Sequence, residues 1–284
     1  MMPTDSPFTV RRMRADELDL IRAWATREGW NPGVHDAAAF YAADPHGFFV
    51  GELAGEPVAC VSCVAYGDEF GFLGQYIVRP DARGRGYGVK TWAAGMAHLG
   101  GRNVGLDGVL NQQANYERSG FRFAHQNIRH EGTGGGSVPA GVVPLSAVPF
   151  DQVVAYDRTC FPAARPEFLR RWITLSDSAA FGVVGDGELR GYGVIRRSTD
   201  GNKIGPLFAD DVRVAERLLR ALWATASGSR VCIDVPDTTA NPLAEGLAQT
   251  FGTRELFRTA RMYTRGIPPA ASSRVFGITT MELG

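Results

Sequence analysis

The chain has 284 residues, 44% of them hydrophobic and 21% charged, and its 30 basic and 30 acidic side chains cancel. This length suits one large domain or two ordinary ones, and the composition is that of a globular protein. The charge balance gives no signal for a nucleic-acid partner. No apolar run reaches the roughly 18 residues of a membrane helix, and residues 1–10 lack the pattern of a signal peptide. We therefore expect a cytoplasmic protein with no nucleic-acid and no membrane partner.

The first half of the chain alternates strand and helix signals. The patterns predict strands at 8–12, 48–52, 58–66, 70–78, 104–109 and 121–129, and helices at 16–30, 36–43, after residue 88, and at 112–119. Cys60 and Cys63 share the strand at 58–66, and side chains three positions apart on a strand face opposite sides. We interpret both as buried structural thiols, and we expect no metal.

A cluster of glycine, serine and proline at 132–139 predicts a linker between two domains. We place a first domain at 1–131, a Gly-rich linker at 132–143 and a second domain at 144–284. The second half repeats the order of the first, with helices at 150–160, 167–172, 212–226 and 242–250, and strands within 181–195 and at 204–208, 230–235 and 256–263. This order indicates an internal duplication in which each half is a mixed α/β sheet.

The segment Arg83–Gly88 joins the strand at 70–78 to a helix. Glycines allow the backbone to approach a ligand closely, so that several N–H groups converge on one point, and the following helix adds the positive end of its dipole. Arginine side chains can add charge-assisted hydrogen bonds to phosphate oxygens. The segment is therefore predicted to bind a pyrophosphate. It matches neither the Walker pattern nor the dinucleotide fingerprint.

Two motifs resemble those of the GNAT N-acetyltransferase superfamily. The pattern V-x-P-x-x-R-G-x-G-x-G, from Val78 to Gly88, is similar to its motif A, and Asn111–Phe121, with a tyrosine four residues before Gly-Phe, looks like its motif B. The segments 30–33, 106–109 and 276–279 further resemble a bacterial group with two GNAT domains in tandem. The resemblance implies tandem, mostly antiparallel sheets, each with a splayed central pair of parallel strands flanked by helices.

The resemblance also implies how acetyl-CoA binds. Backbone groups of Ile77 and Val78 would bond the pantetheine arm, and the Val78 N–H would polarise the thioester carbonyl. Six residues would hold the pyrophosphate: Arg83, Gly84, Arg85, Gly86, Tyr87 and Gly88. Asn111 would bond the pantetheine or merely cap its helix.

Catalytic and acceptor-binding roles follow from the same resemblance. Tyr116 would be the general acid that protonates the leaving thiolate, and the alternative is a tyrosine packed in the core. Glu69 is a candidate general base, although it and Asp68 could belong to a solvated turn. Asp107 could hold a cationic substrate or shape the turn with Gly108.

Further candidates are less specific. Trp30 and Asn31 occupy the loop that borders the acceptor pocket in the family, and Trp30 could equally be a core residue. His125, His130 and Cys160 are weaker candidates for the base.

The second half lacks both motifs. Leu207–Val214, which corresponds to the phosphate loop, has no glycine, and its Asp210 and Asp211 suit a helix start but would repel a pyrophosphate. Ala248 stands where the first half has Tyr116. We therefore expect a degenerate domain that contributes to the acceptor pocket, with the apolar tail 274–284 docked onto the fold.

The sequence thus predicts an acetyl-CoA-dependent N-acetyltransferase that acts by direct attack of a small-molecule primary amine. The alternatives are acetylation of a protein lysine or N-terminus, and a non-catalytic module that senses acyl-CoA. The expected partner is the amine substrate, with the protein a monomer or a homodimer.

Overall fold

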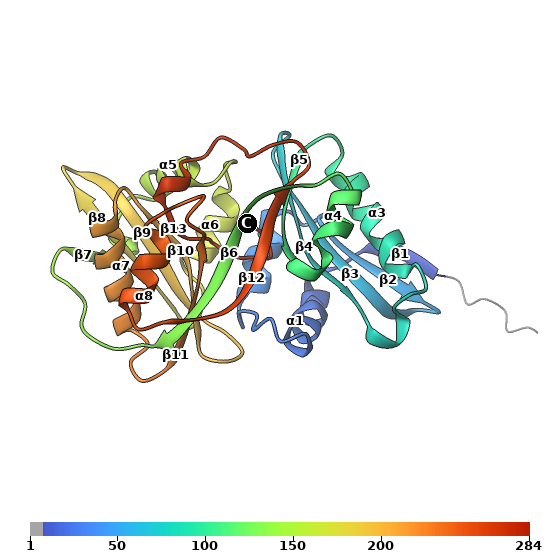
Figure 1. Cartoon of the computed structure of the whole chain (residues 1–284), viewed down its shortest axis with the longest axis horizontal. Coiled ribbons are helices and arrows are strands. Elements are labelled where there is room, and N and C mark those ends of the chain that lie inside the picture. The colour runs from blue at the N-terminus through green and yellow to red at the C-terminus, as the bar shows by residue number, and fades with distance from the viewer. Residues whose placement is uncertain (1–7) are drawn as a thin grey trace, which may run out of the picture.

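The computed structural model describes residues 8–284, so most of the segment 1–10, in which we expect no signal peptide, lies outside the described part. Within that part, no helix is both long and apolar enough to cross a membrane. The first half consists of β1 (Phe8–Arg12), α1 (Leu18–Arg27), α2 (Asp36–Ala43), β2 (Phe48–Leu53), β3 (Glu56–Tyr66), β4 (Phe70–Val78), α3 (Tyr87–Leu99), β5 (Asn103–Val109), α4 (Gln113–Arg118) and β6 (Arg122–Thr133) (Figure 1).

The second half repeats this order, which confirms the predicted mixed α/β class. It consists of β7 (Val142–Pro144), α5 (Phe150–Cys160), α6 (Pro166–Trp172), β8 (Ser178–Gly185), β9 (Glu188–Arg197), β10 (Asn202–Ala209), α7 (Val212–Ala224), β11 (Arg230–Pro236), α8 (Ala244–Thr250), β12 (Arg254–Tyr263) and β13 (Val275–Gly277). The short strands β7 and β13 were not predicted. Gly132 and Thr133, assigned to the linker, extend β6 because they pair with β11.

The two halves exchange their last long strands. The sheet runs β1-β2-β3-β4-β5-β12-β6-β11-β10-β9-β8-β7, with β13 paired to β10. Thus β5 of the first half pairs with β12 of the second, and β11 of the second half pairs with β6 of the first. Figure 1 shows β6 and β12 side by side and antiparallel between the halves. The result is one continuous sheet that neither half can complete alone.

The parallel strands β4 and β5 diverge. Their pairing begins at Phe70 with Asn103 and ends at Leu73 with Leu106, although β4 continues to Val78 and β5 to Val109. A register shift opposite β3 leaves Gln75 with a φ of +48°, which marks a β-bulge where the gap begins. The edge of β4 that faces β5 therefore has no partner strand from Gly74 onward. This confirms the splayed strand pair that the resemblance implied.

The second half has the same divergence, but the chain itself fills it. β10 and β11 are parallel and pair from Asn202 to Ile204 with Val231 to Ile233. Beyond that point β13 pairs antiparallel with β10, and the Ile278 N–H donates to the Asp234 carbonyl of β11 over 2.9 Å. The C-terminal tail thus occupies the gap of the second half and then runs toward the first half, where Figure 1 places the C-terminus between the two.

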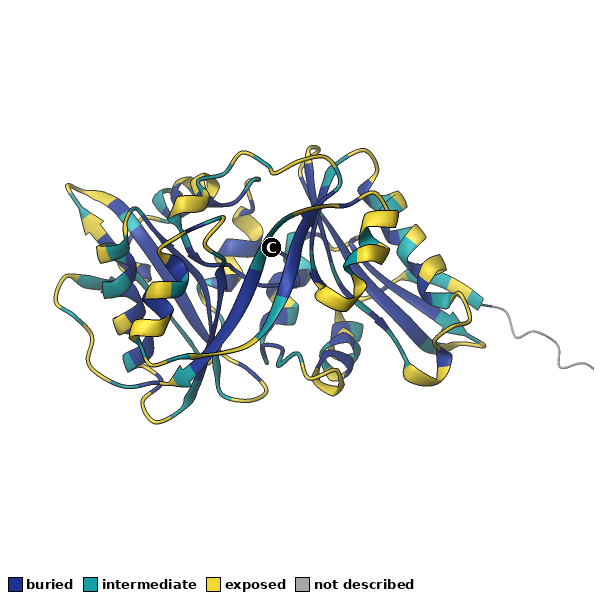
Figure 2. Ribbon diagram, in the orientation of Figure 1, coloured by how far each residue is buried: buried dark blue, intermediate teal, exposed yellow. Residues whose placement is uncertain are grey.

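Apolar residues on alternate faces of the strands form the core, which Figure 2 shows as dark blue strands beneath helices with exposed outer sides. One cluster joins both halves on one face, where Phe40 of α2 stacks on Trp172 of α6 at 5.9 Å. On the opposite face, α3 and α4 cover the first half, while α7 and α8 cover the second. Cys60 and Cys63 belong to clusters on opposite faces, as their spacing predicts.

Buried ion pairs join the exchanged elements. Arg261 of β12 donates two hydrogen bonds, of 2.9 and 2.6 Å, to Asp107 of β5. Arg129 of β6 is similarly paired with Asp234 of β11 at 2.6 Å. Removing one member of such a pair leaves an uncompensated charge in the interior, which is strongly destabilising.

We therefore expect Asp107→Asn to lower the free energy of unfolding by about 3–5 kcal/mol, because Arg261 would remain buried without its counter-charge. Urea denaturation measures this change. The control is Glu216→Gln, which breaks an exposed pair with Arg220 and should cost less than about 1 kcal/mol. If both variants lost the same free energy of unfolding, the pair of Asp107 and Arg261 would not be what holds β12 on β5.

Candidate active site

The predicted phosphate loop forms an open cradle of backbone N–H groups. Gly84 and Gly86 have φ values of +76° and +80°, a region that side chains disfavour, and Gly86 is the residue before α3. In the described part of the chain, no backbone carbonyl accepts a hydrogen bond from the N–H groups of residues 84–89. These groups are free to bind an anion at the positive end of a 13-residue helix.

Gly88 allows α3 to approach β4. A Cβ atom at Gly88 would overlap the Tyr76 hydroxyl and the Val78 side chain. The glycine therefore sets how closely the free N–H groups lie to the end of β4, where the gap opens.

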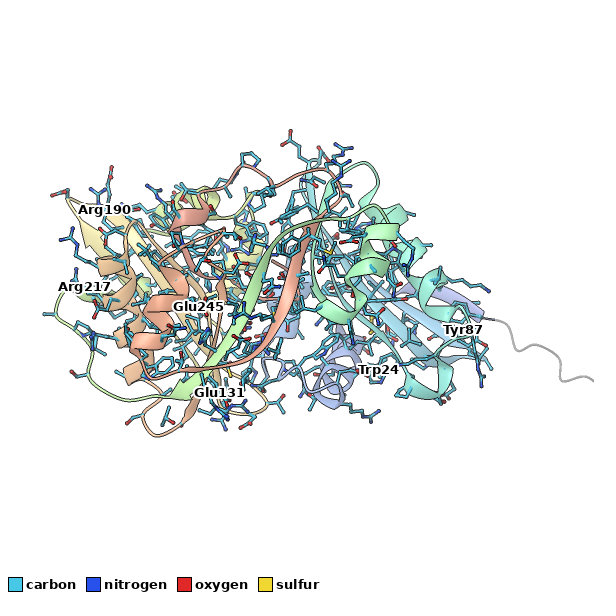
Figure 3. The ribbon with its side chains drawn as sticks, in the orientation of Figure 1. Trp24, Tyr87, Glu131, Arg190, Arg217 and Glu245 are labelled. Carbon is cyan, nitrogen blue, oxygen red and sulfur yellow. The ribbon has the colours of Figure 1, made fainter. Side chains whose placement is uncertain are left out.

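The side chains of the loop have different surroundings. Arg83 donates to the Val78 carbonyl over 2.9 Å and to Glu28, directly after α1, over 2.5 Å, which fixes it at the mouth of the gap. Arg85 is exposed and makes no ion pair within residues 8–284. The Tyr87 ring stacks on Phe8 of β1 at 4.7 Å, and Figure 3 places it at the outer end of the first half, so only its backbone can face a ligand in the cradle.

A cavity of about 870 Å³ occupies the gap between β4 and β5. One wall is the free edge of β4, and the other consists of the end of β5 and the start of α4. Several residues that the sequence analysis singled out line it: Trp30, Ile77, Val78, Arg83, Asp107, Asn111 and Tyr116. The cavity therefore brings the strand edge of motif A and the tyrosine of motif B to one place.

Tyr116 lies half-buried on the wall opposite β4. Its ring stacks on Trp92 at 6.0 Å and covers Gly108, where a Cβ atom would overlap it. Burial, together with the nearby Tyr76, raises the pKa of Tyr116 to about 12. The phenol therefore carries its proton throughout the neutral range, as a proton donor requires. Asn111, in the 3-10 turn Leu110–Gln112, is exposed at the edge of the same wall.

Asp107 lines the cavity, but its carboxylate is already bonded. Arg261 donates to both of its oxygens, and the Asn127 amide donates to Oδ1 over 2.7 Å. The carboxylate is fully buried, so the structure gives Asp107 the task of joining β5 to β12. We do not assign it the binding of a cationic substrate.

Trp30 and the adjacent Asn31 have different surroundings. Trp30 lines the cavity, and its carbonyl accepts a hydrogen bond from Arg129 over 2.9 Å. Asn31 is not among the lining residues, and its amide exchanges two hydrogen bonds with the backbone of Asp200 in the second half. Asn31 therefore ties the two halves together outside the cavity.

Glu69 is poorly placed for a general base. It is exposed and directly precedes Phe70, whereas the gap opens only after Leu73 and widens toward Val78. Because a strand advances about 3.3 Å per residue, the run of β4 carries Glu69 away from the cavity. None of the remaining candidates lines this cavity either: Asp68, His125, His130 and Cys160.

The sequence analysis singled out none of the five lining residues that come from β6, β12 and the tail: Arg129, Phe257, Thr259, Met281 and Glu282. Their positions depend on the strand exchange and on the route of the tail, which no local pattern reveals. The only hint was the apolar character of the terminal segment.

The second half has no corresponding cradle. Asp211 caps α7 by accepting hydrogen bonds from the N–H groups of Arg213 and Val214, and Ala248 is buried. The backbone N–H groups that would have to bind a phosphate are therefore already bonded to the Asp211 side chain at the start of α7.

Comparison with known proteins identifies the family. A model of the acetyltransferase (GNAT) family matches residues 15–121, and one of the acetyltransferase (GNAT) domain matches residues 153–277. The holothin acyltransferase of Pseudoalteromonas sp. (strain SANK 73390) is 34% identical over 288 residues, which cover 100% of this chain and 97% of that protein. The chain belongs to the GNAT acetyltransferase family. It contains two GNAT domains in tandem, and enzymes of this family use acyl-CoA.

Solved structures share the two-domain GNAT fold. A candidate acetyltransferase from Pyrococcus horikoshii has a TM-score of 0.81 at 20% identity, with 98% of this chain and 96% of that chain covered. The tandem GNAT protein of the clavulanic acid biosynthesis pathway has a TM-score of 0.61 at 16% identity, with 90% and 98% covered. The gap between β10 and β11 is therefore the GNAT counterpart of the gap between β4 and β5.

Replacing Gly86 with aspartate tests the cradle. The variant would place a carboxylate beside the free N–H groups, so we expect the affinity for coenzyme A to fall at least about tenfold, or about 1.4 kcal/mol. Isothermal titration calorimetry measures it.

Gly228→Asp is the matched control for this variant, because Gly228 has a φ of +70°, open space around it and a place in the turn after α7. It should bind coenzyme A like the unchanged chain. If Gly86→Asp also kept full affinity, the loop would not be the phosphate site.

Proposed function

We propose that this GNAT protein is an acetyl-CoA-dependent N-acetyltransferase that acts by direct attack of a primary amine of a small molecule. The proposal rests on the groups that surround the gap between β4 and β5. Free N–H groups lie at its open end, the unpaired edge of β4 runs along it, and a protonated tyrosine stands on the opposite wall.

The described residues fit the parts of acetyl-CoA. The N–H groups of residues 84–89 would bind the pyrophosphate, with Arg85 free to add a charged hydrogen bond. Backbone groups of Ile77 and Val78 would bond the pantetheine arm. The Val78 N–H would not reach a thioester at the closed end of the gap, because the four residues from Gly74 to Val78 span about 13 Å of strand. The pyrophosphate site is at the wide end of the gap, so the acyl group would lie toward its closed end, near Gly74.

Tyr116 would supply the proton for the departing thiolate. Since burial raises the pKa of its phenol to about 12, the hydroxyl carries its proton at neutral pH and has one to donate as the carbon–sulfur bond breaks. A tyrosine with no catalytic role would not need to line the cavity, and this favours an enzyme over a module that only senses acyl-CoA.

The acceptor side supports a small substrate. Arg129 of β6, together with Thr259 and Met281 of the second half, lines the cavity on this side, whereas a lysine on a folded protein would need an open approach. The relative from Pseudoalteromonas is named for holothin, and we propose holothin as the first acceptor to test. We further propose a cytoplasmic enzyme, since all four cysteines are buried and free.

We expect Tyr116→Phe to bind acetyl-CoA as tightly as the unchanged chain but to lower kcat by about 10²–10⁴-fold, the usual contribution of a positioned general acid. The measurement is thiol release with acetyl-CoA and an amine panel that includes holothin. Because the acid form is the active one and its pKa is raised, kcat should not fall between about pH 7 and about pH 10 through loss of this proton.

Tyr41→Phe is the matched control, because Tyr41 of α2 stacks on Phe48 and does not line the cavity. It should leave kcat unchanged. Full turnover by Tyr116→Phe would remove Tyr116 from this role, and tight acetyl-CoA binding without thiol release from any amine would favour the sensing module.

A further inference from the structure

The tail ends its path at the closed end of the active-site gap. After β13 leaves the gap of the second half, residues 279–283 are all buried. The N–H groups of Glu282 and Leu283 both donate to the Thr280 hydroxyl, over 3.2 and 2.8 Å, which fixes a tight turn. This turn presses against β4, because a Cβ atom at Gly74 would overlap the Glu282 carbonyl. Glu282 is thus fixed where β4 and β5 begin to diverge.

Only one oxygen of the Glu282 carboxylate lies near a partner. Its Oε1 lies 3.7 Å from Lys203 Nζ of β10, while its Oε2 is buried and has no hydrogen-bond partner within residues 8–284. An ionised group buried with an unused acceptor is costly unless a ligand or a water molecule supplies the missing donor. Glu282 lines the large cavity, so that donor can come from a molecule bound there.

The surroundings keep this carboxylate ionised. Burial opposes the charge, but Lys203, Arg129 and Arg196 together outweigh it and lower the pKa of Glu282. Asp234 acts in the opposite direction and is itself paired with Arg129. The two arginines already have partners: Arg129 bonds Asp234 and the Trp30 carbonyl, and Arg196 bonds Asp36.

A second unused acceptor lies on the adjoining residue of β4. The amide oxygen of Gln75 is buried, has no partner in the described part of the chain, and belongs to the same lining. Two residues of one cavity lining, each with an unpaired side-chain acceptor, suit a group that donates several hydrogen bonds. A primary amine is such a group, and a carboxylate or phosphate is not.

We propose that Glu282 binds the nitrogen of the acceptor amine, and that the second domain delivers it through a tail seated in its own unused coenzyme gap. This inference rests on the proposed function and specifies its acceptor site. The Oε2 atom accepts a hydrogen bond from the amine N–H and thereby orients the nitrogen toward the acyl group at the closed end. A primary amine can donate to both Glu282 and Gln75, whereas a hydroxyl or a thiol has a single donor hydrogen.

The test uses the full chain with Glu282→Gln, which keeps the size of the side chain and removes its charge. We expect unchanged acetyl-CoA affinity, a KM for the amine raised at least tenfold, and a smaller change in kcat. Glu282→Asp keeps the charge and should recover part of the loss. The matched control is Glu131→Gln, a glutamate of similar burial on β6 that pairs with Arg230 outside the cavity and should leave both constants unchanged.

The outcomes separate the two hypotheses. An unchanged amine KM in Glu282→Gln, with the unchanged chain active, would overturn the role of Glu282 but not the transferase. A loss of acetyl-CoA affinity equal to the loss in amine binding would also overturn it, because the residue would then act on the whole fold. No thiol release by the unchanged chain, with acetyl-CoA bound, would overturn the transferase and this inference together.

Discussion

Because β12 hydrogen-bonds to β5 and β6 hydrogen-bonds to β11, neither half of this protein can complete its sheet without the other. The exchange forces charged residues into the interior, and these are compensated in pairs such as Asp107 with Arg261. It also removes the free edge that β5 would otherwise expose to solvent. The active-site cavity is a consequence of the same pairing, since β6 and β12 supply its acceptor-side residues.

Both domains have a gap between two parallel strands, but the gaps differ in what surrounds and fills them. In the first domain, free backbone groups, a glycine cradle and Tyr116 surround an open cavity. In the second, the cradle is replaced by a capped helix, and β13 fills the space that a coenzyme arm would need. The second domain thus has a capped helix start in place of a free cradle, and the tail fills its gap. Because β13 runs antiparallel to β10, the residues that follow it head toward the first domain. Glu282 therefore reaches the cavity between β4 and β5.

The sequence predicted what depends on local patterns. Periodicity predicted the long strands and helices, and the glycines and arginines of Arg83–Gly88 predicted the open cradle, since positive φ values and free N–H groups follow from a few adjacent residues. The strand exchange was not predictable in this way, because β6 and β12 have the same alternation whichever neighbour they pair with. Asp107 illustrates the consequence: its interpretation as a substrate ligand fails once Arg261 arrives from 154 positions away. Glu69 fails for a simpler reason, since it precedes the end of β4 that is far from the cavity.

We propose that one gap receives the coenzyme and that the other holds the tail. A crystal structure of the full chain with coenzyme A would show both gaps at once. We expect one coenzyme per chain, with pantetheine between β4 and β5, Val275–Gly277 still paired with β10, and Glu282 beside Gly74. Coenzyme density between β10 and β11, with the tail displaced, would contradict this proposal.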